Sequence, residues 1–419
     1  MKIWPFIVGA LVLGAGFGGT QVRRKLEMGP PVQDTLTATT DQKKLLASTT
    51  NVPSSNESDF FYELLTVIKQ NYVEPVDDEQ KLSLGAVRGM VNSLADPNVQ
   101  YLNDKQFPAF ERAMKGEFEG IGVELRLVYD KDQLQKFHAA QDKLADWNAN
   151  GRKDVDGKLE ELPSMESGGL IPDVVVSSVM PGSPAEKAGL KPGDLIDGVD
   201  GKWSISRSEV LELNRAFDRM RLGSTERDAY LKLREKYIKR SDNAIPAARL
   251  IERLTAGTEG SVKLVWRSAG KPPQTATVAK ALTTVKPLIG DRLIFMKGVA
   301  DEVSGKTVFD LRGSGFGDFS AMKEALSKLL PTGDYGRLSK ENKPFHVEGS
   351  GSLAPPLTLR VDSTTTGAAR FFAAVLKSAG RAKLDGDLGP DPILAYDTIT
   401  VQGGTAYILP TAIYTGDTK

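Results

Sequence analysis

The stretch that decides the fold is PGSPAEKAGLKPGD, which covers residues 181–194 of this 419-residue chain. Its Pro, Gly and Ser residues predict tight turns, a short helix that ends at Gly189, and a strand that begins at Asp194. Upstream, FEGIGVELRL at residues 118–127 predicts a Gly-rich turn followed by an alternating strand. Together these segments predict a small β domain over residues 116–283.

Two charge-rich segments interrupt that domain, at about 130–170 and 204–245. Both have helical stretches, so we interpret them as insertions that decorate the β domain. A solvated helical decoration is the simpler interpretation, and a lid or partner surface is the alternative.

The composition is that of a soluble globular protein with a buried core, because 40% of residues are hydrophobic and 26% are charged. Lys plus Arg and Asp plus Glu both number 54, so no basic excess points to nucleic acid. The absence of cysteine excludes disulfides and thiolate chemistry. The two histidines, His138 and His346, stand alone in polar surroundings. We therefore predict no metal site and no cofactor.

The N-terminus carries a targeting signal. Residues 3–19 form an uncharged, mostly apolar run between Lys2 and the basic cluster Arg23–Lys25. A run of about this length can span a bilayer or serve as a secretory signal. We assign residues 1–28 as an anchor or signal and residues 29–57 as a flexible stalk. The favoured location is membrane-anchored and extracytoplasmic, in the cell envelope or periplasm, and a secreted protein is the alternative.

The rest of the chain combines helices with strands, so the predicted fold class is α+β. Apolar spacing predicts a helical segment over residues 58–115. In residues 284–419, strand-like and helix-like segments alternate, which predicts a mixed β/α core. Strands are expected at 306–312 and 357–362, and a helix is expected over 368–379.

Residues from about 59 to 419 resemble the carboxy-terminal processing, or tail-specific, serine peptidases. The resemblance rests on motifs that occur in the family's order: LGAVRGM at 84–90, SLADP at 93–97, GIGV at 120–123, the 181–194 segment, DLRG at 310–313 and GRA at 380–382. It implies a PDZ module embedded in a peptidase-type core.

The Gly-rich turn is the predicted peptide-binding site. Successive backbone N–H groups in such a turn can cradle a terminal carboxylate, and the strand that follows can pair with an extended peptide. The predicted binding residues are Gly120, Ile121, Gly122, Val123 and Leu125, and the predicted partner is a peptide or protein C-terminus. A hairpin turn with three core apolar residues is the alternative.

The resemblance fails at the catalytic positions. The family uses a Ser-Lys dyad with a supporting Gln, and these positions fall on Gly367, Pro392 and Tyr396. Glycine has no side chain and proline cannot accept a proton, so the resemblance implies that catalysis has been lost. A relocated nucleophile, Ser363 or Thr366, is the alternative, although a Ser/Thr run before a helix is usually a cap and turn.

Three functions remain open on the sequence. The favoured one is a non-catalytic envelope scaffold that binds extended peptides or protein C-termini. The rivals are an active serine-type endopeptidase with a relocated nucleophile and a purely structural envelope protein. The sequence makes no prediction of oligomeric state.

Overall fold

The computed structural model describes Asp96, residues 98–129, 171–220, 223–401 and 404–416, together with four isolated positions. From Asp96 onward these residues belong to one compact unit. The predicted anchor and stalk, most of the predicted helical segment, and the first insertion lie outside them. Within the described ranges, no helix is long and apolar enough to cross a bilayer.

An antiparallel sheet forms the β domain that the 181–194 segment predicts, and β3 is one of its edges. Its strands, in spatial order, are β3 (Val123–Val128), β4 (Asp173–Val179), β5 (Leu195–Val199), β7 (Ser261–Arg267) and β8 (Gln274–Ala279), with β6 (Lys202–Trp203) paired to β5. The short helix α8 (Pro184–Lys187) begins after Ser183, whose hydroxyl accepts a hydrogen bond from the Glu186 amide at 3.1 Å. A capping serine followed by proline thus sets the turn.

The helix α11 (Ala247–Thr255) closes this domain. Its residues Leu250 and Leu254 are fully buried against strand residues that include Val176 and Trp266. The chain enters and leaves the domain through one short ladder, in which β2 (Glu117–Phe118) pairs with β9 (Thr283–Thr284). Between β6 and α11, the helices α9 (Arg207–Arg219) and α10 (Ser224–Ser241) form a hairpin, where the second insertion was predicted.

The C-terminal core contains a mostly parallel sheet that carries the motif-bearing loops. Its strands, in spatial order, are β10 (Leu288–Ile289), β11 (Arg292–Leu293), β12 (Val308–Asp310), β15 (Leu357–Val361) and β16 (Ala382–Gly386), and the last four are parallel. Three helices accompany it: α12 (Val299–Glu302), α13 (Phe319–Leu329) and α14 (Gly367–Ser378).

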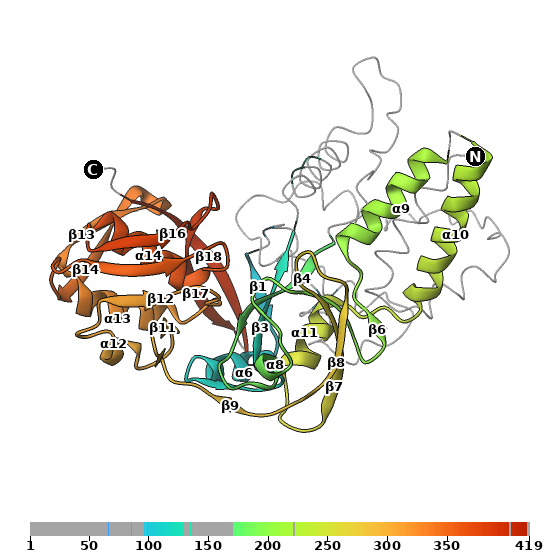
Figure 1. Cartoon of the computed structure of the whole chain (residues 1–419). Coiled ribbons are helices and arrows are strands. Elements are labelled where there is room, and N and C mark those ends of the chain that lie inside the picture. Colours follow the sequence, from blue (N-terminus) through green and yellow to red (C-terminus); the bar gives the residue numbers. More distant parts are fainter. Residues whose placement is uncertain are drawn as a thin grey trace, which may run out of the picture. The chain divides into compact units, whose positions relative to one another are not determined.

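A second sheet packs on the other side of α13 and α14 (Figure 1). It consists of β1 (Gln100–Leu102), β18 (Thr405–Thr415), β13 (Pro331–Leu338) and β14 (Lys343–Ser350), with β17 (Ile393–Val401) also paired to β18 and a 3-10 turn at Lys340–Asn342. One buried cluster joins both sheets through the two helices. It includes Phe309 and Leu359 from the mostly parallel sheet and Phe345 and Tyr414 from the second sheet. This arrangement confirms the predicted α+β class.

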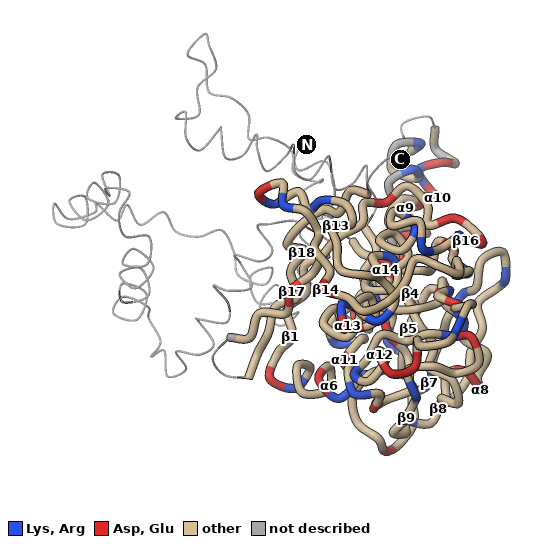
Figure 2. Tube along the Cα trace, turned by 90° about the vertical axis from the view of Figure 1, so that its left-hand side faces the viewer, with Lys and Arg blue, Asp and Glu red and all other residues tan. Residues whose placement is uncertain are grey.

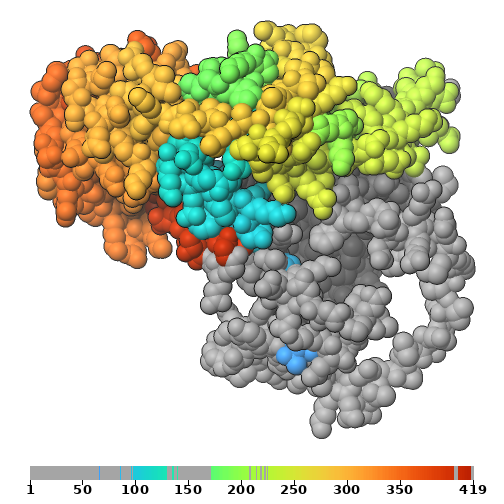
Figure 3. Space-filling view, turned by 90° about the horizontal axis from the view of Figure 1, so that it is seen from below, coloured from blue at the N-terminus to red at the C-terminus, as the bar shows by residue number. Residues whose placement is uncertain are grey.

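The segment that holds β1 and the helix α6 (Gln106–Ala113) lies between the two domains. Figure 3 shows it in cyan, flanked by C-terminal residues in orange and red and by β-domain residues in yellow and green. The charged residues of the described chain are of mixed sign throughout, with Lys and Arg interspersed among Asp and Glu (Figure 2). This distribution matches the zero net charge.

Candidate functional site

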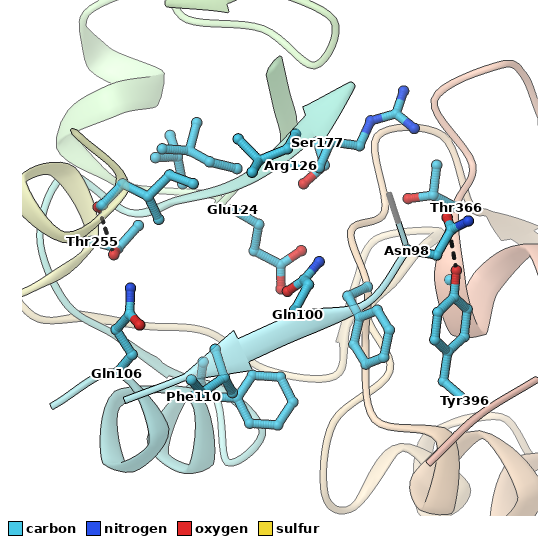
Figure 4. A pocket seen from close by; sticks show the side chains of 18 of the residues that line it. Asn98, Gln100, Gln106, Phe110, Glu124, Arg126, Ser177, Thr255, Thr366 and Tyr396 are labelled. Carbon is cyan, nitrogen blue, oxygen red and sulfur yellow. Dashed lines mark hydrogen bonds between the residues drawn. The ribbon is translucent and has the colours of Figure 1, made fainter. Parts of the chain in front are cut away.

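A cavity of about 510 Å³ lies where the β domain, the α6 segment and the core meet. Its walls come from β3, α11, α6, the start of α14 and the loop that leads into β17. Figure 4 shows Glu124 near the middle, with Thr366 and Tyr396 at one end and Thr255 and Gln106 at the other. Seven of the ten residues singled out from the sequence line this cavity: Val123, Leu125, Ser363, Thr366, Gly367, Pro392 and Tyr396.

The nucleophile position has no room for a side chain. Gly367 has a φ of +54°, which is in the left-handed region. A Cβ atom built there would lie 2.2 Å from the carbonyl oxygen of Phe316. The same oxygen accepts a hydrogen bond from the Ala368 amide at 2.7 Å. An amide in the first turn of a helix is the kind of donor that an oxyanion needs, and this one is occupied.

The positions expected for the lysine base and the supporting glutamine are occupied by Pro392 and Tyr396. Pro392 lines the cavity but has no group that can accept a proton. The ring of Tyr396 packs edge-on against Phe316 at 5.0 Å and tilted against Phe319 at 5.4 Å. Its hydroxyl donates to the Asn98 Oδ1 atom at 3.4 Å, and burial raises its pKa above the usual value. Tyr396 therefore serves as a half-buried aromatic anchor at the cavity wall.

The fallback hydroxyls differ in their surroundings. The Thr366 hydroxyl donates to the carbonyl oxygen of Ser314 at 3.1 Å, and the neighbouring Thr365 hydroxyl donates to that of Leu311 at 3.1 Å. Both bonds tie the turn before α14 to the loop after β12. Ser363 is exposed at the edge of the cavity.

In the part of the chain that the structure describes, no lysine lines the cavity beside these hydroxyls. Among the described residues that line the cavity, Lys105 is the one lysine, and it directly precedes Gln106 at the far end from Thr366 (Figure 4). Lys377 and Lys383 are exposed and do not line the cavity. Among the described residues, the geometry thus offers hydroxyls without a neighbouring lysine amine.

The predicted carboxylate-binding turn is engaged in internal hydrogen bonds. The Gly120 amide donates to the carbonyl oxygen of Gly257, and the Ile121 amide donates to that of Leu254, both at 2.9 Å. At Gly122, a Cβ atom would lie 2.4 Å from Ser183 Cβ, so this glycine permits close packing on α8. None of the three lines the cavity, whereas Val123 and Leu125 do.

Glu124 is a functional candidate that the sequence did not reveal. Its Oε2 atom is buried without a hydrogen-bond partner, and Gly315 makes room for it, since a Cβ there would lie 1.2 Å from that oxygen. Burial raises the pKa of this carboxyl to about 7, although a backbone hydrogen bond from Phe316 and the charge of Arg292 act in the opposite direction. The side chain thus joins the β domain to the core.

Arg126 and Arg370 are two further candidates, one from each domain. Arg370, on the first turn of α14, donates to the carbonyl oxygens of Leu388, Gly389 and Asp391 and so fixes the loop before β17. Arg126, on β3, has a buried Nε atom with no partner. In the sequence, Arg126 is only a polar position of the alternating strand VELRLV, and nothing marks Arg370.

Comparison with known proteins agrees with the motifs. Residues 175–216 match the profile of a PDZ domain, and residues 11–106 match the N-terminal domain of the activating protease CtpB. The chain is a relative of the carboxy-terminal processing proteases. It is 25% identical over 397 residues to the carboxy-terminal processing protease CtpB of Bacillus subtilis, a match that covers 92% of this chain and 68% of CtpB.

Two further relatives support this placement. Carboxy-terminal processing protease CtpA of Bacillus subtilis is 24% identical over 331 residues, covering 76% of this chain and 57% of CtpA. The solved structure of a photosystem II D1 C-terminal processing protease shares the fold, with a TM-score of 0.51 and 20% identity over 86% of this chain and 83% of that one. The chain thus has a PDZ match and shares the fold of this solved structure.

Proposed function

We propose that this protein is a catalytically inactive relative of the carboxy-terminal processing proteases that binds extended peptides or protein C-termini. The observation that carries the proposal is one continuous cavity, lined by the β3 edge and α11 on one side and by Gly367, Pro392 and Tyr396 on the other. In this proposal an extended peptide adds to the edge of β3 and continues into the cleft of the core.

Inactivity is supported by the chemistry of the cleft. Hydrolysis by a Ser-Lys mechanism requires a hydroxyl beside an unprotonated amine. At the corresponding positions this chain has a glycine that is pressed against Phe316 and a proline. The occupied amide of Ala368 removes a further stabilising group.

Peptide binding can be tested by filling the groove. Ala256 lines the cavity at the end of α11, whereas Ala248 is exposed on the same helix and does not line it. We expect Ala256→Trp to weaken the binding of an unstructured peptide at least about tenfold, measured by calorimetry, because an indole would occupy the groove. Ala248→Trp should bind like the original protein. Equal affinity in both variants, or no binding by the original protein, would favour a structural role.

The rival function is an active endopeptidase that uses Ser363 or Thr366. It is favoured by one observation, the position of both hydroxyls at the cavity. Incubation of the full chain with an unstructured substrate should give no time-dependent cleavage. Cleavage that disappears in Ser363→Ala or Thr366→Ala, but persists in Ser352→Ala at an exposed position outside the cavity, would establish the enzyme instead.

We also propose that residues 1–28 hold the protein at the membrane, with the folded part outside the cytoplasm. The support for the anchor is the apolar run of residues 3–19, which is long enough to span a bilayer. The full chain should then fractionate with membranes and resist extraction by salt. Complete recovery in the soluble secreted fraction would indicate a cleaved signal.

A further inference from the structure

The turn that was expected to receive a carboxylate lacks two of its donors. The amides of Gly120 and Ile121 bond the C-terminal end of α11 at 2.9 Å each. A peptide that lies along β3 could therefore not use these two amides as donors. Glu124 adds a carboxyl group two residues after the turn, on the cavity wall. A second carboxylate is disfavoured close to it. An acidic group on a bound peptide needs another receptor.

Arg126 has the properties of such a receptor. It lies two residues beyond Glu124 on the same strand, so both side chains project from the same face of β3 into the cavity. Its Nε atom is buried and has no partner, and within the described chain no carboxylate forms an ion pair with it. A guanidinium that is partly desolvated and unpaired is costly, so Arg126 itself is complementary to an anion.

The charged groups around Arg126 act in both directions. Burial lowers its pKa, Asp391 and Tyr396 act to raise it, and the positive charge of Arg370 lowers it again. Arg370 is already committed to three backbone carbonyl groups, although its Nε atom is also buried without a partner. Two guanidinium groups thus face one cavity from opposite domains, and Arg126 is the one whose donors are not used.

We infer that Arg126 is the receptor for a carboxylate of the bound peptide, placed at the vacant catalytic cleft rather than at the Gly-rich turn. A carboxylate fits a guanidinium through two parallel N–H···O hydrogen bonds, a geometry that lysine and backbone amides cannot reproduce. This inference rests on the proposed peptide binding and adds the chemistry that selects the peptide. The carboxylate is the peptide's C-terminus or an acidic side chain, and the experiment separates these sources.

The test measures the binding of four versions of one unstructured peptide to the full chain. The peptide ends in a free acid or an amide, and it contains Glu or Gln near that end. The protein is compared with Arg126→Gln, with Arg126→Lys and with a control, Arg249→Gln, which removes an exposed charge on α11 outside the cavity. Thermal melting of each variant checks that it is folded.

The expected result is that one carboxylate tightens binding by about 10- to 100-fold. Arg126→Gln should abolish this difference, so that the four peptides bind to this variant with similar affinities. Arg126→Lys should retain only part of it, and Arg249→Gln should retain all of it. Dependence on the terminal acid identifies a C-terminus as the ligand, and dependence on Glu identifies an acidic side chain.

Two outcomes would overturn the inference, and they differ. If all four peptides bind equally well to every variant, the proposed peptide binding stands and Arg126 has no role in selection. If none of the peptides binds, the proposed function itself fails, and the carboxylate receptor fails with it. If Arg126→Gln does not fold, retention of the full carboxylate preference by Arg126→Lys would also contradict the bidentate receptor.

Discussion

Gly367 shows at the scale of one residue how the backbone restricts the position where the family resemblance expects a nucleophile. Its positive φ costs a side-chain-bearing residue about 1–2 kcal/mol, and the Phe316 backbone stands where a Cβ would go. We expect Gly367→Ser to lower the free energy of unfolding by about 2–4 kcal/mol, because backbone overlap adds to the conformational cost. We also expect it to cleave no unstructured substrate. Denaturant unfolding and a cleavage assay measure the two effects.

Gly380 provides the matched control for this change. It has a φ of +71° and open space around its Cβ position. Gly380→Ser should therefore cost only the conformational part, about 1 kcal/mol. Equal losses in the two variants would show that the Phe316 contact does not matter. Proteolysis by Gly367→Ser would show that the cleft has kept the rest of its catalytic machinery.

Glu124 predicts a pH dependence of stability with a definite sign. Its carboxyl pKa is about 7 in the folded chain against an ordinary value of 4.5. Between these values the folded state holds a proton that the unfolded state has released. The free energy of unfolding therefore falls as pH rises through this window, by at most about 3 kcal/mol, and levels off above the folded pKa.

The change Glu124→Gln isolates this contribution. The stability of the variant minus that of the original protein should grow from about pH 4.5 to 7 and stay constant at higher pH, measured by urea unfolding at each pH. A difference that is flat over the whole range would mean that the carboxyl group is hydrated and titrates normally. A difference of the opposite sign would mean that folding stabilises the ionised form of Glu124 instead of its protonated form.

At the scale of an element, the α9–α10 hairpin is held by a small network around Glu209. This carboxylate accepts hydrogen bonds from Trp203 Nε1 at 2.8 Å and from Arg240 at 2.6 Å. Arg240 lies 4.4 Å from the centre of the Trp203 ring, which also stacks on Tyr237 at 5.8 Å. The polar and aromatic contacts therefore depend on the same residues.

We expect Glu209→Ala to destabilise the hairpin by about 2–3 kcal/mol, since it leaves a buried indole N–H and a guanidinium without their acceptor. Hydrogen exchange should accelerate in α9 and α10 and stay slow in β7. Glu235→Ala, which removes an exposed pair with Lys239 on the same hairpin, should change nothing measurable. Faster exchange in β7 as well would show that the hairpin supports the whole β domain.

The sequence predicted those elements whose own residues determine their conformation, without help from a distant partner. Pro, Gly and Ser turn residues marked α8, and the predicted strands at 306–312 and 357–362 correspond to β12 and β15. The hairpin of β13 and β14 was missed because PTGDYGRL contains few strand-forming residues and depends on its partners for pairing. Arg126 and Glu124 were missed for a similar reason, because a polar residue in an alternating strand does not reveal that another domain covers it.

At the scale of the whole molecule, the cavity exists only because distant segments converge. Its walls include Asn98 before β1, Arg126 on β3, Thr255 on α11 and Tyr396 on β17. The predicted vacant positions and the predicted binding strand are therefore neighbours in space, although more than 240 residues separate Leu125 from Gly367. A ligand that fills the cavity would contact the β domain, the α6 segment and the core together.

This convergence predicts that peptide binding stabilises the protein as a unit. At a peptide concentration of about 100 times Kd, the folded state should gain about 2.7 kcal/mol, which raises the melting temperature by a few degrees. Hydrogen exchange should slow in β3, in α11 and in the loop before β17, since each lines the cavity. Protection limited to β3 and α11 would mean that the peptide stops at the PDZ groove, and that the vacant cleft has no part in its recognition.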